Sequence, residues 1–412
     1  MAPEFDELDI SAKSFWAATA EEREATFALL RRDRPVSWQR PVEPTLPMPP
    51  GPGYWAVVGH ADIVEVSRNS GVFLSSKGIH MEPVPEEVLE ATSSFLAMDG
   101  KKHDKTRGLV RAAFTPRAVN QLVESINTNA VRIVAELIDA GSGCDFVRNC
   151  AIKLPLVTIS DLIGVPDDQR EAVRDAADSM VSVSDPDFIG DREPLQVMFE
   201  SSMFIHQVAV EMAQDRRRSP RDDVMTNLVQ AEIDGEGLTD AEIGAFMILM
   251  SVAGNDTTRQ ATSLTLRALT QFPEQREWLV ADFDGRIETA VEEFLRWATP
   301  VMTFARTAAI DYTLDGRDIM AGEKVVMFYS SGNRDAQTFG HPERFDLSRH
   351  PNHHVAFGGG GAHYCLGAQL ARAQLRAIFR ELLRVLPGIQ AGEPTYLTGN
   401  FIRSVQSMPC TF

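Results

Sequence analysis

Residues 357–386 read FGGGGAHYCLGAQLARAQLRAIFRELLRVL, so four glycines, a cysteine and an amphipathic helical pattern follow one another directly. The pattern predicts a helix that begins near Leu366, with Cys365 at its N-terminus. Backbone N–H groups and the positive end of the helix dipole lower the pKa of a thiol placed there. The glycines permit backbone conformations closed to other residues and leave N–H groups free to point at the sulfur. We therefore expect Cys365 to be a metal ligand or a nucleophile.

Three other interpretations compete for this segment. A phosphate-binding loop would continue into G-K-[ST], which does not follow here. A zinc site is suggested by the crowding of five of the nine histidines near the cysteine: His341, His350, His353, His354 and His363. However, no second cysteine and no H-x-x-x-H pair accompanies them. A cysteine nucleophile also stays open, although the sequence matches none of the known thiol-protease signatures.

The composition is that of an ordinary globular protein, with 412 residues of which 44% are hydrophobic and 24% charged. A net charge of -18 disfavours nucleic acid and anionic lipid as partners. The longest dense apolar run, residues 245–254, is too short for a membrane span, and the acidic N-terminus does not resemble a signal peptide. Four cysteines are too few for a disulfide framework in a chain of this length. We expect a cytoplasmic protein without a membrane span.

The apolar periodicity predicts a mainly α fold with a smaller β-rich subregion, in a single domain over residues 1–412. Short alternating runs with glycines at the turns place most of the β-rich part at about 54–80 and 301–330. Between them, from about 115 to 295, the period is helical, with breaks predicted at Gly141, Pro155, Pro166, Pro186, Pro220 and Pro273. Seven of the 23 prolines lie between Pro35 and Pro52 and predict an irregular connection.

One predicted helix is long and has a polar centre. Thr239 and Glu242 form a capping-box sequence, and helical spacing continues to Phe272, before Pro273. Residues 253–258 read AGNDTT directly after the most hydrophobic stretch, where a buried helix should stay apolar. Glycine costs a helix about 1 kcal/mol relative to alanine, and a buried carboxylate needs a partner. The segment is therefore either a groove with an acid and an alcohol beside it or a solvent-exposed polar kink.

These segments together resemble the cytochrome P450 family of haem-thiolate monooxygenases, and the resemblance covers nearly the whole chain. The family's haem-binding loop, F-x-x-G-x-[HR]-x-C-x-G, is matched at Gly361, His363, Cys365 and Gly367. Its E-x-x-R pair is matched at Glu293 and Arg296, and its oxygen-activation motif by AGNDTT. The resemblance implies the cytochrome P450 fold and the cofactor haem b, iron protoporphyrin IX. The third partner of the Glu293–Arg296 ion pair stays open between Arg344 and Arg349.

The resemblance also assigns roles around the cofactor. Cys365 becomes the axial ligand, because a thiolate donates electron density to the iron and favours O–O cleavage. His103 and Arg107 match an H-x-x-x-R motif that binds the haem propionates, and Arg306 and His363 match further propionate contacts. The remaining positions that match cofactor contacts are Ala253, Phe357, Gly358 and Gly367. Phe357 lies eight residues before Cys365, where the commoner pattern has seven, so this loop holds one extra residue.

The same family motif makes Asp256 and Thr257 the catalytic pair. Thr257 would hold the oxygen and an ordered water, while Asp256 relays protons from solvent. Family members that use peroxide directly typically lack such an acid and alcohol. Their presence here therefore favours dioxygen with a reductant.

The reductant must come from another protein, because the sequence has no flavin or nicotinamide domain and no strand-borne G-x-G-x-x-G. The resemblance implies a ferredoxin and a ferredoxin reductase. Residues 101–117 carry six Lys or Arg against one Asp, and residues 366–384 four Arg against one Glu, so both segments are expected to form a basic docking surface. We expect a monomer that oxidises a hydrophobic small molecule of the lipid, sterol or terpenoid class. The alternative is a haem- or zinc-binding sensor or ligand carrier without catalysis.

Overall fold

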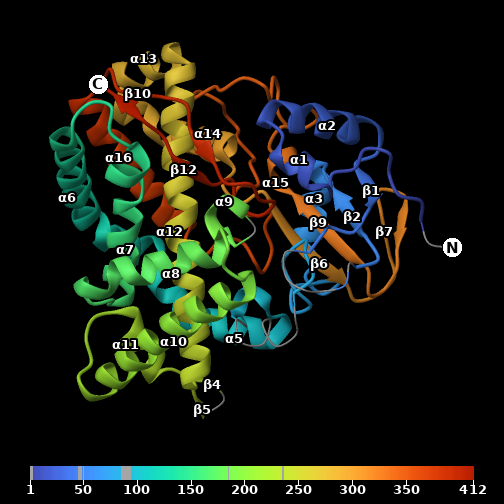
Figure 1. Ribbon diagram of the computed structural model, residues 1–412, viewed down its shortest axis with the longest axis horizontal. Helices are drawn as coiled ribbons and strands as arrows, with labels where there is room; N and C mark the ends of the chain where they lie inside the picture. Colours follow the sequence, from blue (N-terminus) through green and yellow to red (C-terminus); the bar gives the residue numbers. More distant parts are fainter. Residues whose placement is uncertain (1–2, 45–48, 50, 85–93, 184, 234–235) are drawn as a thin grey trace.

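The computed structural model describes residues 3–44, 49, 51–84, 94–183, 185–233 and 236–412. Most helices pack against one another, and the main sheet lies beside them with the N-terminal helices (Figure 1). The prediction of a mainly α fold with a smaller β-rich subregion is confirmed. No helix in the described ranges is both long enough and apolar enough to cross a membrane.

The described α-helices are α1 Lys13–Ala17, α2 Ala20–Asp33, α3 His60–Arg68, α5 Gly100–Arg111, α6 Pro116–Ala140, α7 Lys153–Ile163, α8 Arg170–Ser182, α9 Pro186–Ile189, α10 Pro194–Arg218, α11 Val224–Gln230, α12 Asp240–Gln271, α13 Pro273–Ala281, α14 Phe283–Ala298, α15 Tyr329–Gly332 and α16 Ala368–Val385. Gly141 ends α6 with a φ of 83°, as predicted. Pro155 lies in the first turn of α7, and Pro186 and Pro273 begin α9 and α13. All three prolines lie in the first turn of a helix, where the N–H that proline lacks would have no partner within the helix.

In the described part of the chain, the main sheet contains five strands in the order β1-β2-β9-β6-β3. They are β1 Val36–Gln39, β2 Tyr54–Val57, β3 Phe73–Leu74, β6 Thr303–Ala308 and β9 Lys324–Phe328. β2 pairs in parallel with β9, and the other pairs are antiparallel. Four strands lie in the two predicted β-rich regions. The exception is β1, which lies in the proline-rich connection that we expected to be irregular. All four of its residues are buried, and Gln39 pairs with Tyr54.

The other strands among the described residues form four short antiparallel pairs. They are β4 Glu232–Ile233 with β5 Glu236–Gly237, β7 Tyr312–Leu314 with β8 Arg317–Ile319, β10 Gln390–Ala391 with β13 Cys410–Thr411, and β11 Thr395–Tyr396 with β12 Val405–Ser407.

Helix α12 passes through the helical part of the molecule (Figure 1). It has 32 residues, which corresponds to about 48 Å. Thr239 and Glu242 form the predicted capping box, and the helix ends at Gln271, two residues before Pro273. Residues near its middle are buried even where they are polar, as Asn255 and Asp256 show with exposed fractions of 4% and 2%. The long predicted helix is therefore confirmed, and its polar centre is no solvent-exposed kink.

A buried ion pair on α14 joins this helix to the irregular chain after α15. Glu293 and Arg296 are fully buried and form two hydrogen bonds, of 2.7 and 2.8 Å. Arg349 donates its Nε to Glu293 at 3.2 Å, which settles the open third partner. Arg344 takes part only through its carbonyl oxygen, which accepts from Arg296 at 2.9 Å. The three side chains therefore hold together segments far apart in the sequence.

Candidate active site

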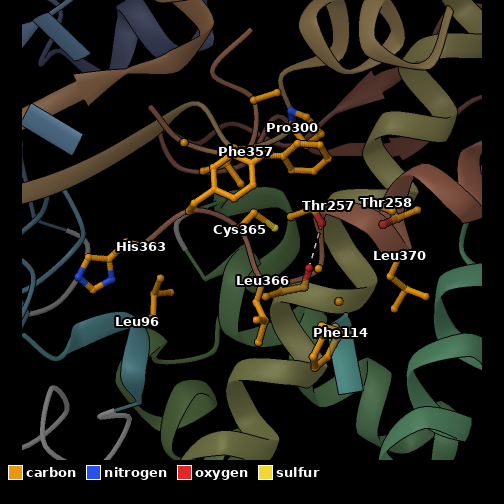
Figure 2. Close-up of a pocket in the computed structure, with 18 of the residues that line it drawn as sticks. Leu96, Phe114, Thr257, Thr258, Pro300, Phe357, His363, Cys365, Leu366 and Leu370 are labelled. Carbon is orange, nitrogen blue, oxygen red and sulfur yellow. Dashed lines mark hydrogen bonds between the residues drawn. The ribbon is translucent and has the colours of Figure 1, made fainter. Parts of the chain in front are cut away.

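A cavity of about 200 Å³ lies between α12 and the segment that carries Cys365. Ala253 and Thr257 line it from α12, and Phe357 and Cys365 line it from the opposite side. Figure 2 shows the sulfur of Cys365 and the hydroxyl of Thr257 at the same space, with Phe357 and Pro300 close by. The structure thus brings the predicted ligand and the predicted oxygen-activation motif to one site.

The glycines before Cys365 adopt backbone conformations that other residues rarely take. Gly358, Gly360 and Gly361 have φ values of 92°, 98° and 76°. A side chain on Gly359 would collide with Ser67. The Cys365 N–H donates to the carbonyl of Phe357 at 3.0 Å, which closes the loop. Phe357 lines the cavity despite the extra residue in the loop, because the glycine turns absorb it.

The expectation for the Cys365 thiol is wrong in one respect. Enclosure by the cavity walls raises the pKa of Cys365, although the N–H of Gly367 and the charges of Arg107 and Arg372 partly oppose this rise. Helix α16 begins at Ala368, three residues later, so its N-terminal dipole does not outweigh the loss of water around the sulfur. A metal ion deprotonates a thiol that coordinates it, so the role of Cys365 as a ligand does not require a low intrinsic pKa.

One edge of the cavity carries the predicted histidine and arginine side chains. Arg107, Arg306 and His363 line it directly. His103 is 2% exposed and packs behind His363, with 4.4 Å between the ring centroids and 49° between the ring planes. Among the described residues, neither His103 Nε2 nor His363 Nδ1 has a hydrogen-bond partner, although both are buried. Unpaired buried nitrogens are costly, so this edge is suited to polar atoms of a ligand.

These observations test whether the residues fit the cofactor that the resemblance implies. Haem b is a flat apolar ring with a central metal and two carboxylates at one edge. The cavity offers apolar walls, a thiol, and an edge with two arginines and the unsatisfied Nδ1 of His363, behind which lies the unsatisfied Nε2 of His103. The residues present therefore fit the group. Within the described ranges, no three His, Cys, Asp or Glu side chains are placed to hold a metal ion together.

Asp99 is a member of this edge that the sequence analysis did not identify. It accepts hydrogen bonds from the backbone N–H groups of Ser75 and Ser76, each at 2.9 Å, and lies 3.9 Å from His363 Nε2. Burial alone would raise the pKa of Asp99, but the nearby His363 ring and the hydrogen bonds from Ser75 and Ser76 hold it well below its usual range. Asp99 therefore stays ionised beside His363. Its position just before Gly100, where α5 begins, was the available signal.

The polar residues at the centre of α12 differ in whether they line the cavity. Thr257 donates its hydroxyl to the carbonyl of Ala253 at 2.9 Å and lines the cavity. Asp256 does not line it; its carboxylate accepts from Arg259 and, at 3.0 Å, from Gln260. Arg259 in turn donates to Asp178 on α8 at 2.7 Å, and the Asp178 side chain is 22% exposed. The buried acid is thus connected to the surface through an ion-pair network.

Gly254 lies where α12 meets both the cavity and helix α7. It lines the cavity, but a Cβ at this position would lie 2.6 Å from the side chain of Ile159 on α7. The glycine therefore lets α7 pack closely against α12, in addition to leaving room at the cavity.

The structure contradicts the predicted basic surface on one of its two segments. On α5, Lys101, Lys102 and Arg111 are exposed and form no ion pair within the described part of the chain. The arginines of α16 instead form an arginine–acid ladder with α14, whose rungs are Arg372–Glu292, Arg376–Glu288 and Arg380–Asp284, each at 2.6 Å. Arg384 pairs with Glu381 on its own helix. The charge of α16 is therefore neutralised, and the expectation of a basic surface there was wrong.

Comparisons with known proteins agree with this geometry. The cytochrome P450 family model matches residues 39–386. The chain is 38% identical over 412 residues to a methyl-branched lipid omega-hydroxylase of Mycobacterium tuberculosis, which covers 98% of this chain and 95% of that protein. It is 40% identical over 386 residues to a steroid C26-monooxygenase of Rhodococcus jostii, with 92% and 80% covered. A solved Mycobacterium marinum cytochrome P450 in complex with pseudoionone has a TM-score of 0.98 and 58% identity over the full length of both chains.

Proposed function

Because the chain belongs to the cytochrome P450 family of haem monooxygenases, we propose that it hydroxylates a methyl-branched hydrophobic small molecule, with Cys365 as the haem ligand and a separate ferredoxin as electron donor. The observation that carries this proposal is the meeting of Cys365 and Thr257 at one apolar cavity. We further propose that the enzyme acts as a monomer of one domain in the cytoplasm.

Bound haem supplies the activation of dioxygen and the transfer of one oxygen atom to the substrate. The chain's own residues hold and surround it. Cys365 would ligate the iron, and Arg107, Arg306, His103 and His363 would hold the propionates through charge-assisted hydrogen bonds. Asp99 lies on the Nε2 side of His363. It would therefore keep the imidazole ring turned so that the other nitrogen, Nδ1, faces the edge of the cofactor.

Residues of α12 would deliver the protons that the reaction consumes. The Thr257 hydroxyl donates to Ala253, which leaves its oxygen lone pairs available to an ordered water in the cavity. Asp256 is the neighbouring acid, and its network through Arg259 reaches the partly exposed Asp178. We propose that Asp256 passes protons to the water that Thr257 holds, while Arg259, which stays protonated, keeps this acid in place beside the partly exposed Asp178. The apolar remainder of the cavity excludes loose water.

The substrate class rests on the relatives and on the cavity wall. A methyl-branched lipid, a steroid oxidised at C26 and pseudoionone share an apolar chain with methyl branches. The cavity offers matching apolar contacts from Leu96, Leu249, Val301 and Phe304. We therefore propose hydroxylation at the methyl-branched end of such a chain, which brings the most apolar part of the substrate toward the site.

The docking surface for the ferredoxin is proposed on α5. This helix contacts the cysteine loop, residues 357–365, because Arg107 donates to the carbonyl of Tyr364, the residue before Cys365. Lys101, Lys102 and Arg111 are exposed on the same helix. Against a chain of net charge -18, they form a local positive region that attracts an acidic partner.

The ligand assignment is tested by the carbon monoxide spectrum of the reduced enzyme. Wild type is expected to show the strongly red-shifted Soret band of thiolate ligation, and Cys365→Ser to lose it while keeping its helical content, because the ligand is one bond and the core lies elsewhere. Serine variants of Cys144, Cys150 and Cys410 are the controls and should keep the band. An unchanged spectrum in Cys365→Ser would show that another residue is the ligand.

The substrate proposal is tested by incubating the enzyme, ferredoxin, its reductase and NAD(P)H with a methyl-branched lipid, a cholesterol-type steroid and an unbranched fatty acid of equal length. The branched substrates are expected to gain one hydroxyl group at the branched end. Faster turnover of the unbranched acid would overturn the proposed preference.

A further inference from the structure

The first rung of the arginine–acid ladder lies closer to the cysteine loop than the other rungs. Arg372 binds Glu292 with two parallel hydrogen bonds, of 2.6 and 2.8 Å. Its guanidinium carbon also lies 4.7 Å from the ring centroid of Phe357. No cation–π contact with the loop is formed by Arg376, whose described partner is Glu288. Arg372 is thus a cation fixed against a residue of the haem-binding loop.

Phe357 links this cation to the ligand. Its ring lines the cavity together with Cys365, and its carbonyl accepts the Cys365 N–H at 3.0 Å. Arg372 itself is absent from the cavity lining and lies behind the ring, with a side chain 16% exposed. A charge held in such a poorly solvated place acts over several ångströms with little screening.

Glu292 fixes and balances this charge. Burial alone would raise the pKa of Glu292, but the hydrogen bonds from Arg372 and His354 lower it to about 2. Both members of the pair are therefore ionised at neutral pH. His354 Nε2 lies 3.1 Å from the same carboxylate, which holds it from a second side.

We propose that the Arg372–Glu292 ion pair sets the electrostatic field on the Cys365 side of the cofactor, and through it the reduction potential of the haem iron. Reduction adds one negative charge at the iron, so a nearby cation favours the reduced state and a nearby anion disfavours it. Residues outside the ligand set tune a metal in this way through charge and hydrogen bonding. Arg372 would act on the iron only indirectly, through its contact with Phe357 and through the electrostatic field of its charge. It is therefore a positioning residue.

The test is the reduction potential of the holoenzyme in matched variants. Arg372→Gln is expected to shift the potential to a more negative value, because Glu292 is left uncompensated. Glu292→Gln is expected to shift it to a more positive value, because Arg372 is then uncompensated. The double variant should return close to the wild-type potential. Opposite shifts of this kind cannot come from a general loosening of the fold.

The second rung supplies the controls. Arg376→Gln and Glu288→Gln remove the same charges one helical turn farther from Cys365 and should leave the potential unchanged. Arg372→Lys keeps the charge and should stay closer to wild type than Arg372→Gln, which preserves a readout if the glutamine variant does not fold. Equal shifts at both rungs, shifts of one sign for Arg372→Gln and Glu292→Gln, or a lysine variant that behaves like glutamine would overturn the proposal.

The inference rests on Cys365 as the haem ligand, and the carbon monoxide spectrum separates the two failures. A wild type without the thiolate band overturns the ligand assignment and this inference with it. A normal thiolate band with unshifted potentials overturns this inference alone.

Discussion

Thr257 is the side chain on α12 whose hydroxyl both bonds the helix backbone and faces the cavity. Thr257→Ala is expected to retain substrate binding and NAD(P)H consumption but to lower product formed per NAD(P)H about tenfold, with hydrogen peroxide released instead, because the water for proton transfer loses its partner. Product, peroxide and NAD(P)H are measured together.

Thr262 provides a matched control for this prediction. It lies five residues further along α12, makes the same kind of hydrogen bond to the carbonyl of Thr258 at 2.8 Å, and does not line the cavity. Thr262→Ala should keep wild-type coupling. If Thr257→Ala also keeps it, Thr257 does not take part in proton delivery.

Single residues also show where prediction from sequence reached its limit. The hydrogen bond from Thr257 to Ala253 could be predicted, because it is local and follows from helix geometry. The pKa of Cys365 could not, because it depends on walls contributed by distant segments. Asp99 was missed for the same reason: its partners Ser75 and His363 lie far from it in the sequence.

At the scale of elements, α5 and α16 carry similar numbers of basic residues but differ in their surroundings. Lys102→Gln on α5 is expected to slow reduction by an acidic ferredoxin several-fold, because it removes an exposed cation of the proposed docking surface. The wild-type rate should also fall more steeply with salt than the variant rate, since about 0.1 M salt screens charges over roughly 10 Å. Stopped-flow reduction at several ionic strengths measures both.

Arg380→Gln on α16 is the control, because Arg380 forms the third rung of the ladder with Asp284. It should reduce the rate much less than Lys102→Gln. Equal rates and equal salt slopes for the two variants would exclude α5 as the docking surface.

Helix α3 offers a prediction about pH. Burial, assisted by Asp315 and Glu65, raises the pKa of Asp62 in its first turn to about 6, against 3.8 for the free side chain. The folded state thus holds this proton more tightly than the unfolded state, so the carboxyl lowers stability increasingly as the pH rises from about 4 to 6. Asp62→Asn should be more stable than wild type by about 1 kcal/mol at pH 8, because solvent screens this partly exposed carboxyl, and by much less at pH 4. Urea unfolding at pH 4 and pH 8 measures the difference in the free energy of unfolding between the variant and wild type. If this difference does not grow with pH, the pKa of Asp62 is not raised.

The elements that were predicted well are those with local signals. Both ends of α12 follow from the Thr239 cap and Pro273. The short strand β1 has no such signal, since its pairing with β2 depends on a segment 15 or more residues away. The neutralised charge of α16 could not be predicted either. Counting the basic residues along one helix does not reveal the acidic residues of α14 that face it.

At the scale of the whole molecule, Glu293 is the anion that balances two buried cations, Arg296 and Arg349. Glu293→Gln leaves both without a countercharge and is expected to lower the free energy of unfolding by about 3–5 kcal/mol. Glu288→Gln, at a carboxylate whose side chain is 71% exposed, should cost no more than about 1 kcal/mol. Denaturant unfolding measures the free energy of unfolding of both variants, and the fraction of haem retained provides a second signal. Similar losses in both variants would mean that the buried cluster does not stabilise the fold.

The same cluster has a consequence for the chain between α15 and α16, which contains no regular helix or strand from 333 to 367. Arg296 donates to the carbonyls of Asn333, Pro342 and Arg344, and Arg349 donates to that of Arg344 as well. The side chain of Arg344 is 70% exposed and would attract trypsin, yet its carbonyl is held by both buried guanidiniums. Proteolytic cleavage after Arg344 therefore requires the cluster to open, so this irregular segment resists digestion as a core helix does.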